Sequence, residues 1–183
     1  MRFAGEDGVA AYGVIMYVNF IFVAIYMGYS IGSAPIVGYH YGAKHQEELR
    51  GLLRRSLWIL GIGAVLLTVA GELFSSPLSK IFVSYDDALF AMTRHGFRLY
   101  SLSYLLCGFN IFGSAFFTAL NNGMVSAVIS FSRTLVFQIV CVLVLPIFLE
   151  LNGIWISILV AEFLGILVTA SLLIANRKKY SYF

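Results

Sequence analysis

Long apolar runs, separated by short polar segments, make up most of the chain. Five of these runs are about as long as the twenty or so residues that a helix needs to cross a bilayer. They cover approximately residues 9–39, 52–73, 97–120, 124–149 and 154–175. Because lipid offers backbone groups no hydrogen bonds, such runs are stable in a membrane as helices. The pattern predicts an all-α integral membrane protein, in which residues 1–183 form a single bundle of about five transmembrane helices.

The first two runs leave alternatives open. Residues 9–39 could cross the bilayer with a tilt, or with a break near Pro35. The second run is closed by Glu72, and Pro77 follows soon after. Residues 78–90 could therefore be an interfacial segment that lies on the membrane.

Two short connections predict which runs are neighbours. Asn121–Gly123 separates the third run from the fourth, and Asn152–Gly153 separates the fourth from the fifth. Asn-Gly favours a tight turn because both residues tolerate a positive φ. Turns this short make the helices on either side antiparallel neighbours.

Composition agrees with a membrane protein and excludes several function classes. The chain is 60% hydrophobic and 11% charged, whereas a soluble domain usually carries about 25% charged residues. It contains no Gly-x-Ser-x-Gly, His-Glu-x-x-His or P-loop motif. We therefore expect neither an enzyme nor an ATP-driven pump. The expected surroundings are the lipid bilayer, with no nucleic acid partner and no cofactor or metal.

Small residues inside the runs predict helix packing. Cys107 and Cys141 fall within the third and fourth runs, where they are expected to act as small hydrophobic residues. Gly28 and Gly32, and then Gly38 and Gly42, have the Gly-x-x-x-Gly spacing that lets helix backbones approach closely.

Basic residues between the runs predict the orientation. They gather in the loop after the first run and in the tail after the last, namely Lys44, Arg50, Arg54, Arg55, Arg177, Lys178 and Lys179. Loops rich in Lys and Arg stay on the cytoplasmic side. The C-terminus is then cytoplasmic and the N-terminus lies outside. Because no signal peptide precedes such an outside start, we expect this chain to be part of a longer one, with a partner helix before Met1.

Four of the runs carry a stripe of polar residues. At about 100° per residue, each stripe stays on one face of its helix. The members are Tyr12, Asn19, Tyr26, Ser30 and Ser33; Ser103, Cys107, Asn110, Ser114 and Asn121; Ser126, Ser130, Arg133 and Thr134, with Gln138 further round; and Trp155, Glu162 and Thr169. Together they indicate a bundle around a partly hydrated cavity. The alternative is that these groups only join helices by hydrogen bonds.

Arg133 and Glu162 are the two charges placed most deeply. Arg133 lies about 15 Å from the cytoplasmic end of its helix, so its long side chain could extend back to the surface. Glu162 cannot do so easily, and an intramembrane carboxylate is a candidate functional residue. It could take up a proton, pair with a cation or bond to a neighbouring helix.

Several segments, in order along the chain, resemble one transporter family. They are Ala10–Val14, Gly28–Ala43, Phe116–Gly123, Ser130–Arg133, Leu145–Pro146, Gly153–Trp155 and Ala161–Glu162. These segments resemble helices eight to twelve of the multidrug and toxic compound extrusion (MATE) transporters, in particular the bacterial branch that includes staphylococcal-type drug exporters.

The resemblance implies an incomplete six-helix lobe of a twelve-helix transporter in a bacterial inner (plasma) membrane. The partners would be the preceding helix, the first lobe, and small-molecule drugs or organic cations that are exchanged for Na⁺ or H⁺ by alternating access. Cavity candidates are Asn19, Tyr26, Ser30, Asn110, Ser114 and Gln138, and candidates for ion coupling or intramembrane charge are Glu162 and Arg133. Some family members hold the coupling ion with carboxylates in helices seven and ten. Helix seven is missing, and the third run carries Asn110 but no acidic residue.

Two other functions stay open. One is a lipid-linked oligosaccharide flippase of the same superfamily, whose anionic substrate would favour a cavity rich in Arg and Lys. The other is a membrane fragment or assembly subunit that transports nothing by itself.

Overall fold

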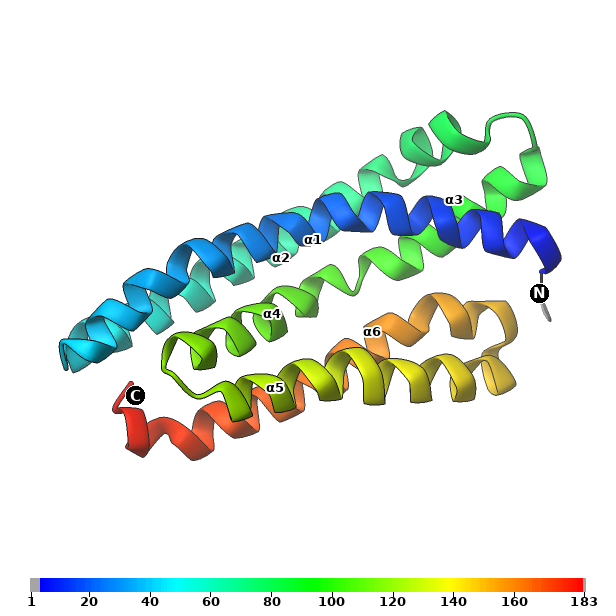
Figure 1. The fold of residues 1–183 in the computed structure, drawn as a ribbon. Coiled ribbons are helices and arrows are strands. Elements are labelled where there is room, and N and C mark those ends of the chain that lie inside the picture. Colours follow the sequence, from blue (N-terminus) through cyan, green and yellow to red (C-terminus); the bar gives the residue numbers. More distant parts are fainter. Residues whose placement is uncertain (1–3, 183) are drawn as a thin grey trace.

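The computed structural model describes residues 4–182, and it is helical almost throughout. In chain order the elements are α1 (Gly5–Gly42), α2 (Gln46–Val83), α3 (Asp87–Ser101), α4 (Tyr104–Ala119), α5 (Gly123–Phe131), the π-helix η1 (Ser132–Phe137) and α6 (Gln138–Tyr180). Their axes run roughly along one direction, and α4 lies between α1 and α6 (Figure 1).

The last element, α6, folds back on itself. Glu150 has φ 49° and ψ −130°, which is outside any helical region, so the helix reverses there. The arms before and after this residue then lie side by side (Figure 1). Gly153 makes the reversal possible, because a Cβ at this position would lie 2.5 Å from the carbonyl carbon and oxygen of Leu145.

With this reversal counted, the chain makes five passes along the bundle. Three helical stretches are long and apolar enough to cross a membrane: Gly5–Gly42, Gln46–Val83 and the 58-residue Gly123–Tyr180. The pair α3 and α4 makes a fourth candidate, bent by 48°. Because the 58-residue stretch reverses at Glu150, it supplies two passes (Figure 1). The prediction of an all-α membrane bundle is confirmed.

Two prolines at which the sequence left an interruption open do not end their helices. α1 continues through Pro35, and α2 continues through Pro77 to Val83. Residues 78–90 are therefore not a separate interfacial segment: they contain the last turns of α2, a short turn and the start of α3. The new helix begins where the Asp86 carboxylate accepts hydrogen bonds from the backbone N–H groups of Ala88 (2.8 Å) and Leu89 (2.9 Å), an N-cap of the usual kind.

Close packing relies on glycines other than those expected. The predicted pairs on α1 face open space at Gly28, Gly32 and Gly42, where a Cβ would have no neighbour within 4 Å. The two tightest contacts of a glycine with another helix are instead on α4. A Cβ on Gly108 would overlap the ring of Tyr26, and one on Gly113 would overlap the methyl group of Thr169.

The contact at Gly108 joins α1 to α4. Tyr26 is 2% exposed, and its hydroxyl donates to the backbone oxygen of Tyr104 at 2.7 Å. The ring thus fills the space that the missing side chain leaves. Small residues serve this purpose in membrane bundles because they let helices approach closely.

Both basic segments lie at the same end of the bundle. The loop between α1 and α2 and the C-terminus lie close together, and the N-terminus lies at the far end (Figure 1). The Nε of Arg50 donates to the backbone oxygen of Ser181 at 3.1 Å, which ties the tail to α2.

We predict that Gly108→Ala destabilises the protein, because the added methyl group forces the Tyr26 ring out of place. Overpacking of this kind costs about 1–3 kcal/mol. Thermal unfolding in detergent measures the change. Gly32→Ala is the matched control, because there the same methyl group enters open space on a helix. This substitution is expected to leave the free energy of unfolding unchanged or to raise it by up to about 1 kcal/mol. Equal effects of the two substitutions would contradict this account of the α1–α4 contact.

Candidate functional site

The two deep charges form an ion pair inside the bundle. Nη1 of Arg133, in η1, lies 3.0 Å from Oε1 of Glu162, in the second arm of α6. Their side chains are 19% and 12% exposed. The pair joins the fourth pass to the fifth, and Arg133 therefore does not extend back to the surface as an isolated anchor.

Asn110 on α4 completes the hydrogen bonding of this carboxylate. Its Nδ2 donates to Oε2 of Glu162 at 2.7 Å and to the Glu162 backbone oxygen at 2.9 Å. Its Oδ1 accepts a hydrogen bond from Oγ1 of Thr169 at 2.8 Å. Each carboxylate oxygen thus has a donor, which a buried carboxylate needs to remain charged. We call Arg133, Glu162, Asn110 and Thr169 the charge network.

A glycine and a π-helix shape the space around the network. A Cβ on Gly165 would lie 2.8 Å from Nδ2 of Asn110 and 3.3 Å from Cγ of Arg133, so a larger residue would push both side chains away. Arg133 itself belongs to the π-helix Ser132–Phe137. Such wide turns occur frequently at functional sites because they strain a helix locally and redirect its side chains.

A cavity of about 280 Å³ lies beside the network, between α1, α4, α5 and η1. Its polar lining comes from Ser30, Asn110, Ser114, Ser130 and Arg133, and its apolar lining includes Val23, Met27 and Ile31. Asn110 and Arg133 belong to the network and to the cavity wall at once. The Ser30 hydroxyl is buried and has no hydrogen-bond partner among residues 4–182.

Serine side chains join α4 to α5 at one end of the cavity. Oγ of Ser114 lies 2.9 Å from Oγ of Ser126 and 2.7 Å from Oγ of Ser130, and Oγ1 of Thr118 lies 2.7 Å from Oγ of Ser126. These bonds link helices, as the alternative interpretation of the polar stripes expects. Ser114 also lines the cavity, so both interpretations apply to it.

The structure brings together some of the predicted site residues but not all. Ser30, Asn110, Ser114 and Arg133 meet at the cavity, and Glu162 lies directly behind two of them. Tyr26 is buried in the α1–α4 contact instead, and Asn19 and Gln138 are half-buried away from this lining. Their proposed role as substrate contacts stays a prediction.

Sequence reasoning missed how these residues pair. The sequence placed Asn110 and Arg133 on stripes of their own and put Glu162 and Thr169 together on one face of their helix, seven residues apart. It gave no sign that these three stripes meet. Glu162 and Thr169 both bond to the same Asn110 side chain.

A second ion pair differs from the first in burial and length. Nε of Arg98 on α3 lies 3.8 Å from Oε2 of Glu72 on α2, with side chains 47% and 38% exposed. Ser101 also donates to Oε1 of Glu72 at 2.8 Å. Between residues 4 and 182 these are the two ion pairs present, so Glu72 provides a natural comparison for Glu162.

Comparisons with known proteins give consistent relatives. The sequence profile of the MatE family matches residues 1–144. The probable multidrug resistance protein YoeA of Bacillus subtilis (strain 168) is 26% identical over 88 residues, which are 48% of this chain and 19% of that protein.

Solved structures share the fold. The Vibrio cholerae MATE transporter VcmN in its bent form superposes with a TM-score of 0.84 at 20% identity, covering 96% of this chain and 41% of that one. A MOP superfamily transporter from Pyrococcus furiosus, whose reversed binding-pocket polarity suggests a different function, superposes with a TM-score of 0.86 at 20% identity, covering 98% and 40%. The chain spans about two fifths of the length of these structures.

We predict that the charge network is much more sensitive to the loss of one partner than to the loss of both charges. Arg133→Met leaves the buried Glu162 carboxylate without its cation, and a loss of this kind costs about 3–5 kcal/mol. The double variant Arg133→Met/Glu162→Leu removes both charges with little change in volume, and it should recover most of that loss in thermal unfolding. Arg98→Met is the control, and because that pair is exposed, a loss of about 1 kcal/mol or less is expected. A double variant as unstable as Arg133→Met would contradict the prediction.

Proposed function

The chain belongs to the MatE family, and on that premise we propose that it supplies part of a cation-coupled antiporter that exports lipophilic organic cations by alternating access. The observation that carries the proposal is the buried charge network at the edge of a polar cavity. Intramembrane ionisable groups are costly, and they usually mark ion or substrate pathways.

The cavity lining suits a substrate that is mostly apolar and carries a positive charge. Val23, Met27 and Ile31 offer apolar contacts, while Ser30 and Ser114 offer hydroxyl oxygens. The one cation among the described lining residues is Arg133, and its charge is balanced by Glu162. The site is then close to neutral and does not repel an organic cation.

Neutralisation of Glu162 would couple the ion to the substrate. A proton on this carboxylate, or a Na⁺ beside it, adds one positive charge to the network and leaves Arg133 uncompensated at the cavity wall. That charge disfavours an organic cation nearby, so the coupling ion and the substrate exclude each other. Such exclusion is reciprocal by thermodynamic necessity, and it is the requirement for exchange.

The rest of the transporter would come from outside these residues. We propose a preceding helix and a first lobe that close the other side of the cavity, in a bacterial inner membrane. The basic segments at one end of the bundle support a cytoplasmic C-terminus.

The flippase alternative is less well supported. A lipid-linked oligosaccharide carries phosphate groups, whose binding favours several unpaired Arg or Lys side chains. The described lining has Arg133 alone, and that residue is already paired. The non-transporting alternative is addressed by the efflux experiment below.

We predict that Glu162→Gln abolishes drug export while the protein still reaches the membrane. The amide keeps an oxygen that can accept from Arg133, but it cannot bind and release a proton or hold a cation as a carboxylate does. Ethidium efflux and drug resistance, measured in drug-sensitive cells that express the transporter containing this lobe, should fall to the level of cells without it. Membrane abundance is measured in parallel.

Glu72→Gln is the matched control for this experiment. Like Glu162, Glu72 lies near an Arg side chain, and it accepts a hydrogen bond from a serine. Its carboxylate, however, lies outside the cavity lining. Export is expected to be retained. Wild-type export in Glu162→Gln cells would remove this residue from the mechanism, and absence of export from the unaltered transporter would favour the non-transporting alternative.

A further inference from the structure

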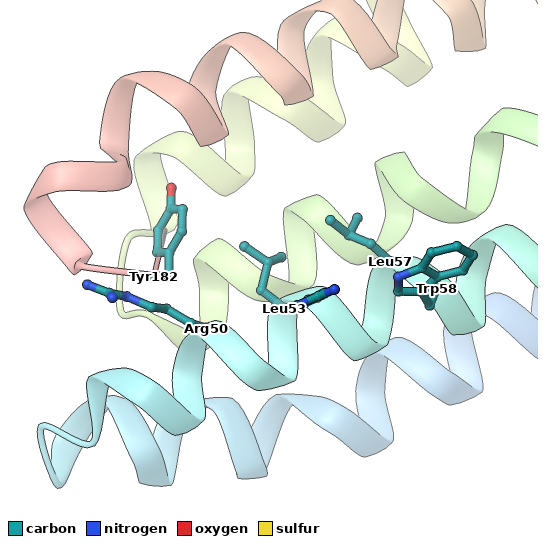
Figure 2. Close-up of a pocket in the computed structure, with 6 residues that line it drawn as sticks. Arg50, Leu53, Leu57, Trp58 and Tyr182 are labelled. Atoms are coloured by element: carbon teal, nitrogen blue, oxygen red, sulfur yellow. The ribbon is translucent and has the colours of Figure 1, made fainter.

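A second hollow lies beside the first half of α2. It has a volume of about 380 Å³ and is lined by Arg50, Leu53, Arg54, Leu57 and Trp58 of α2, together with Tyr182 (Figure 2). Its two leucine side chains are buried or half-buried, whereas its two arginine side chains, which we call its rim, are exposed. The hollow therefore combines apolar surface with positive charge.

The charges at this rim are not neutralised within the described chain. Neither Arg50 nor Arg54 has an ion pair with any residue from 4 to 182. Arg50 donates through Nε to the backbone oxygen of Ser181, which leaves its two terminal nitrogens available. Two guanidinium groups one helical turn apart suit a phosphate, which they bind through parallel N–H groups.

An apolar hollow continues from the first one. It holds about 280 Å³ between α2, α4 and α6 and is lined by residues that include Phe109, Phe112, Ile166 and Ala170. Leu57 lines both hollows, so the two are adjacent at this side chain. We call the combined surface the α2–α6 groove.

The depth of the groove matches the structure of a lipid monolayer. The 38 residues of α2 measure about 57 Å, so roughly 13 Å extends beyond a 30 Å hydrocarbon core at each end. Arg54 lies about 12 Å from the start of the helix, at the edge of that core. Trp58 follows one turn later and is 67% exposed, as is usual for indoles at the membrane interface. The apolar hollow then lies at the level of the acyl chains.

We propose that the α2–α6 groove binds an anionic phospholipid from the leaflet at the α1–α2 end of the bundle. The phosphate lies between Arg50 and Arg54, and an acyl chain follows Leu57 into the apolar hollow. A zwitterionic lipid lacks the net negative charge that these two cations attract, and inorganic phosphate lacks the chain. The proposal does not depend on transport, because none of the residues that line the groove lines the cavity beside the charge network.

Arg54 and Arg55 provide a matched pair of substitutions. They are adjacent, equally charged and at the same depth, but Arg54 lines the groove and Arg55 does not. Native mass spectrometry of the purified protein in neutral detergent measures how much dioleoyl phosphatidylglycerol or dioleoyl phosphatidylcholine stays bound. Arg54→Gln is expected to lower phosphatidylglycerol retention about fivefold, the usual effect of one basic residue near an anionic surface. Arg55→Gln is expected to leave it unchanged.

A second variant tests the apolar part independently of charge. Ala170→Phe fills the hollow from an exposed position, so the fold tolerates it, and it should also lower phosphatidylglycerol retention severalfold. Equal losses in Arg54→Gln and Arg55→Gln would show diffuse attraction and overturn the proposal. Three other results would also overturn the proposal. They are retention of phosphatidylcholine equal to that of phosphatidylglycerol, undiminished phosphatidylglycerol retention in Ala170→Phe, and displacement of the bound lipid by inorganic phosphate.

Discussion

The arrangement of the last three passes depends on one buried carboxylate. Glu162 needs donors for both of its oxygens, and they come from Arg133, 29 residues earlier, and from Asn110, 52 residues earlier. A rotation of any of the three helices would leave a charge or an amide unpaired in an apolar medium, which is strongly unfavourable. The network therefore fixes how α4, η1 and the second arm of α6 are rotated about their axes. This rotation places the polar side chains of Asn110 and Arg133 in the wall of the cavity.

Glycines make this arrangement possible because the polar and aromatic side chains need space. Gly165 leaves room for Asn110 and Arg133, and Gly113, about one turn after Asn110 on the same face of α4, leaves room for Thr169. In water the hydrophobic effect would hold these helices together, but in lipid close contact and hydrogen bonds must do so. The close approach of the helices at these glycines thus allows both the side-chain packing and the hydrogen bonds of the charge network.

The sequence predicts the passes well because lipid demands long apolar runs. The turn at Asn121–Gly123 is found where it was expected, whereas the reversal expected at Asn152–Gly153 is centred on Glu150 instead. It predicts side-chain positions less well, for identifiable reasons. Gln138 follows the π-helix Ser132–Phe137, whose wider turns advance by less than 100° per residue, so every later position is rotated from its expected angle. Pairing of Arg133 with Glu162 depends on three helix rotations at once. Of the spaced glycines on α1, Gly28 and Gly32 meet no other helix among the described residues, whereas a Cβ on Gly38 would lie 3.5 Å from the backbone oxygen of Ala119.

The charge network and the α2–α6 groove share a single residue, Thr169 of α6. Thr169 donates to Asn110 of the charge network, and it also lines the apolar part of the α2–α6 groove. A lipid in the groove and a neutralised Glu162 would therefore act on the same hydrogen bond from opposite sides. Any coupling free energy between them must be reciprocal, so a lipid that shifts ion affinity is itself bound differently when the ion is present. Thr169 is 3% exposed and packs against Gly113, so this one side chain belongs both to the wall of the groove and to the charge network.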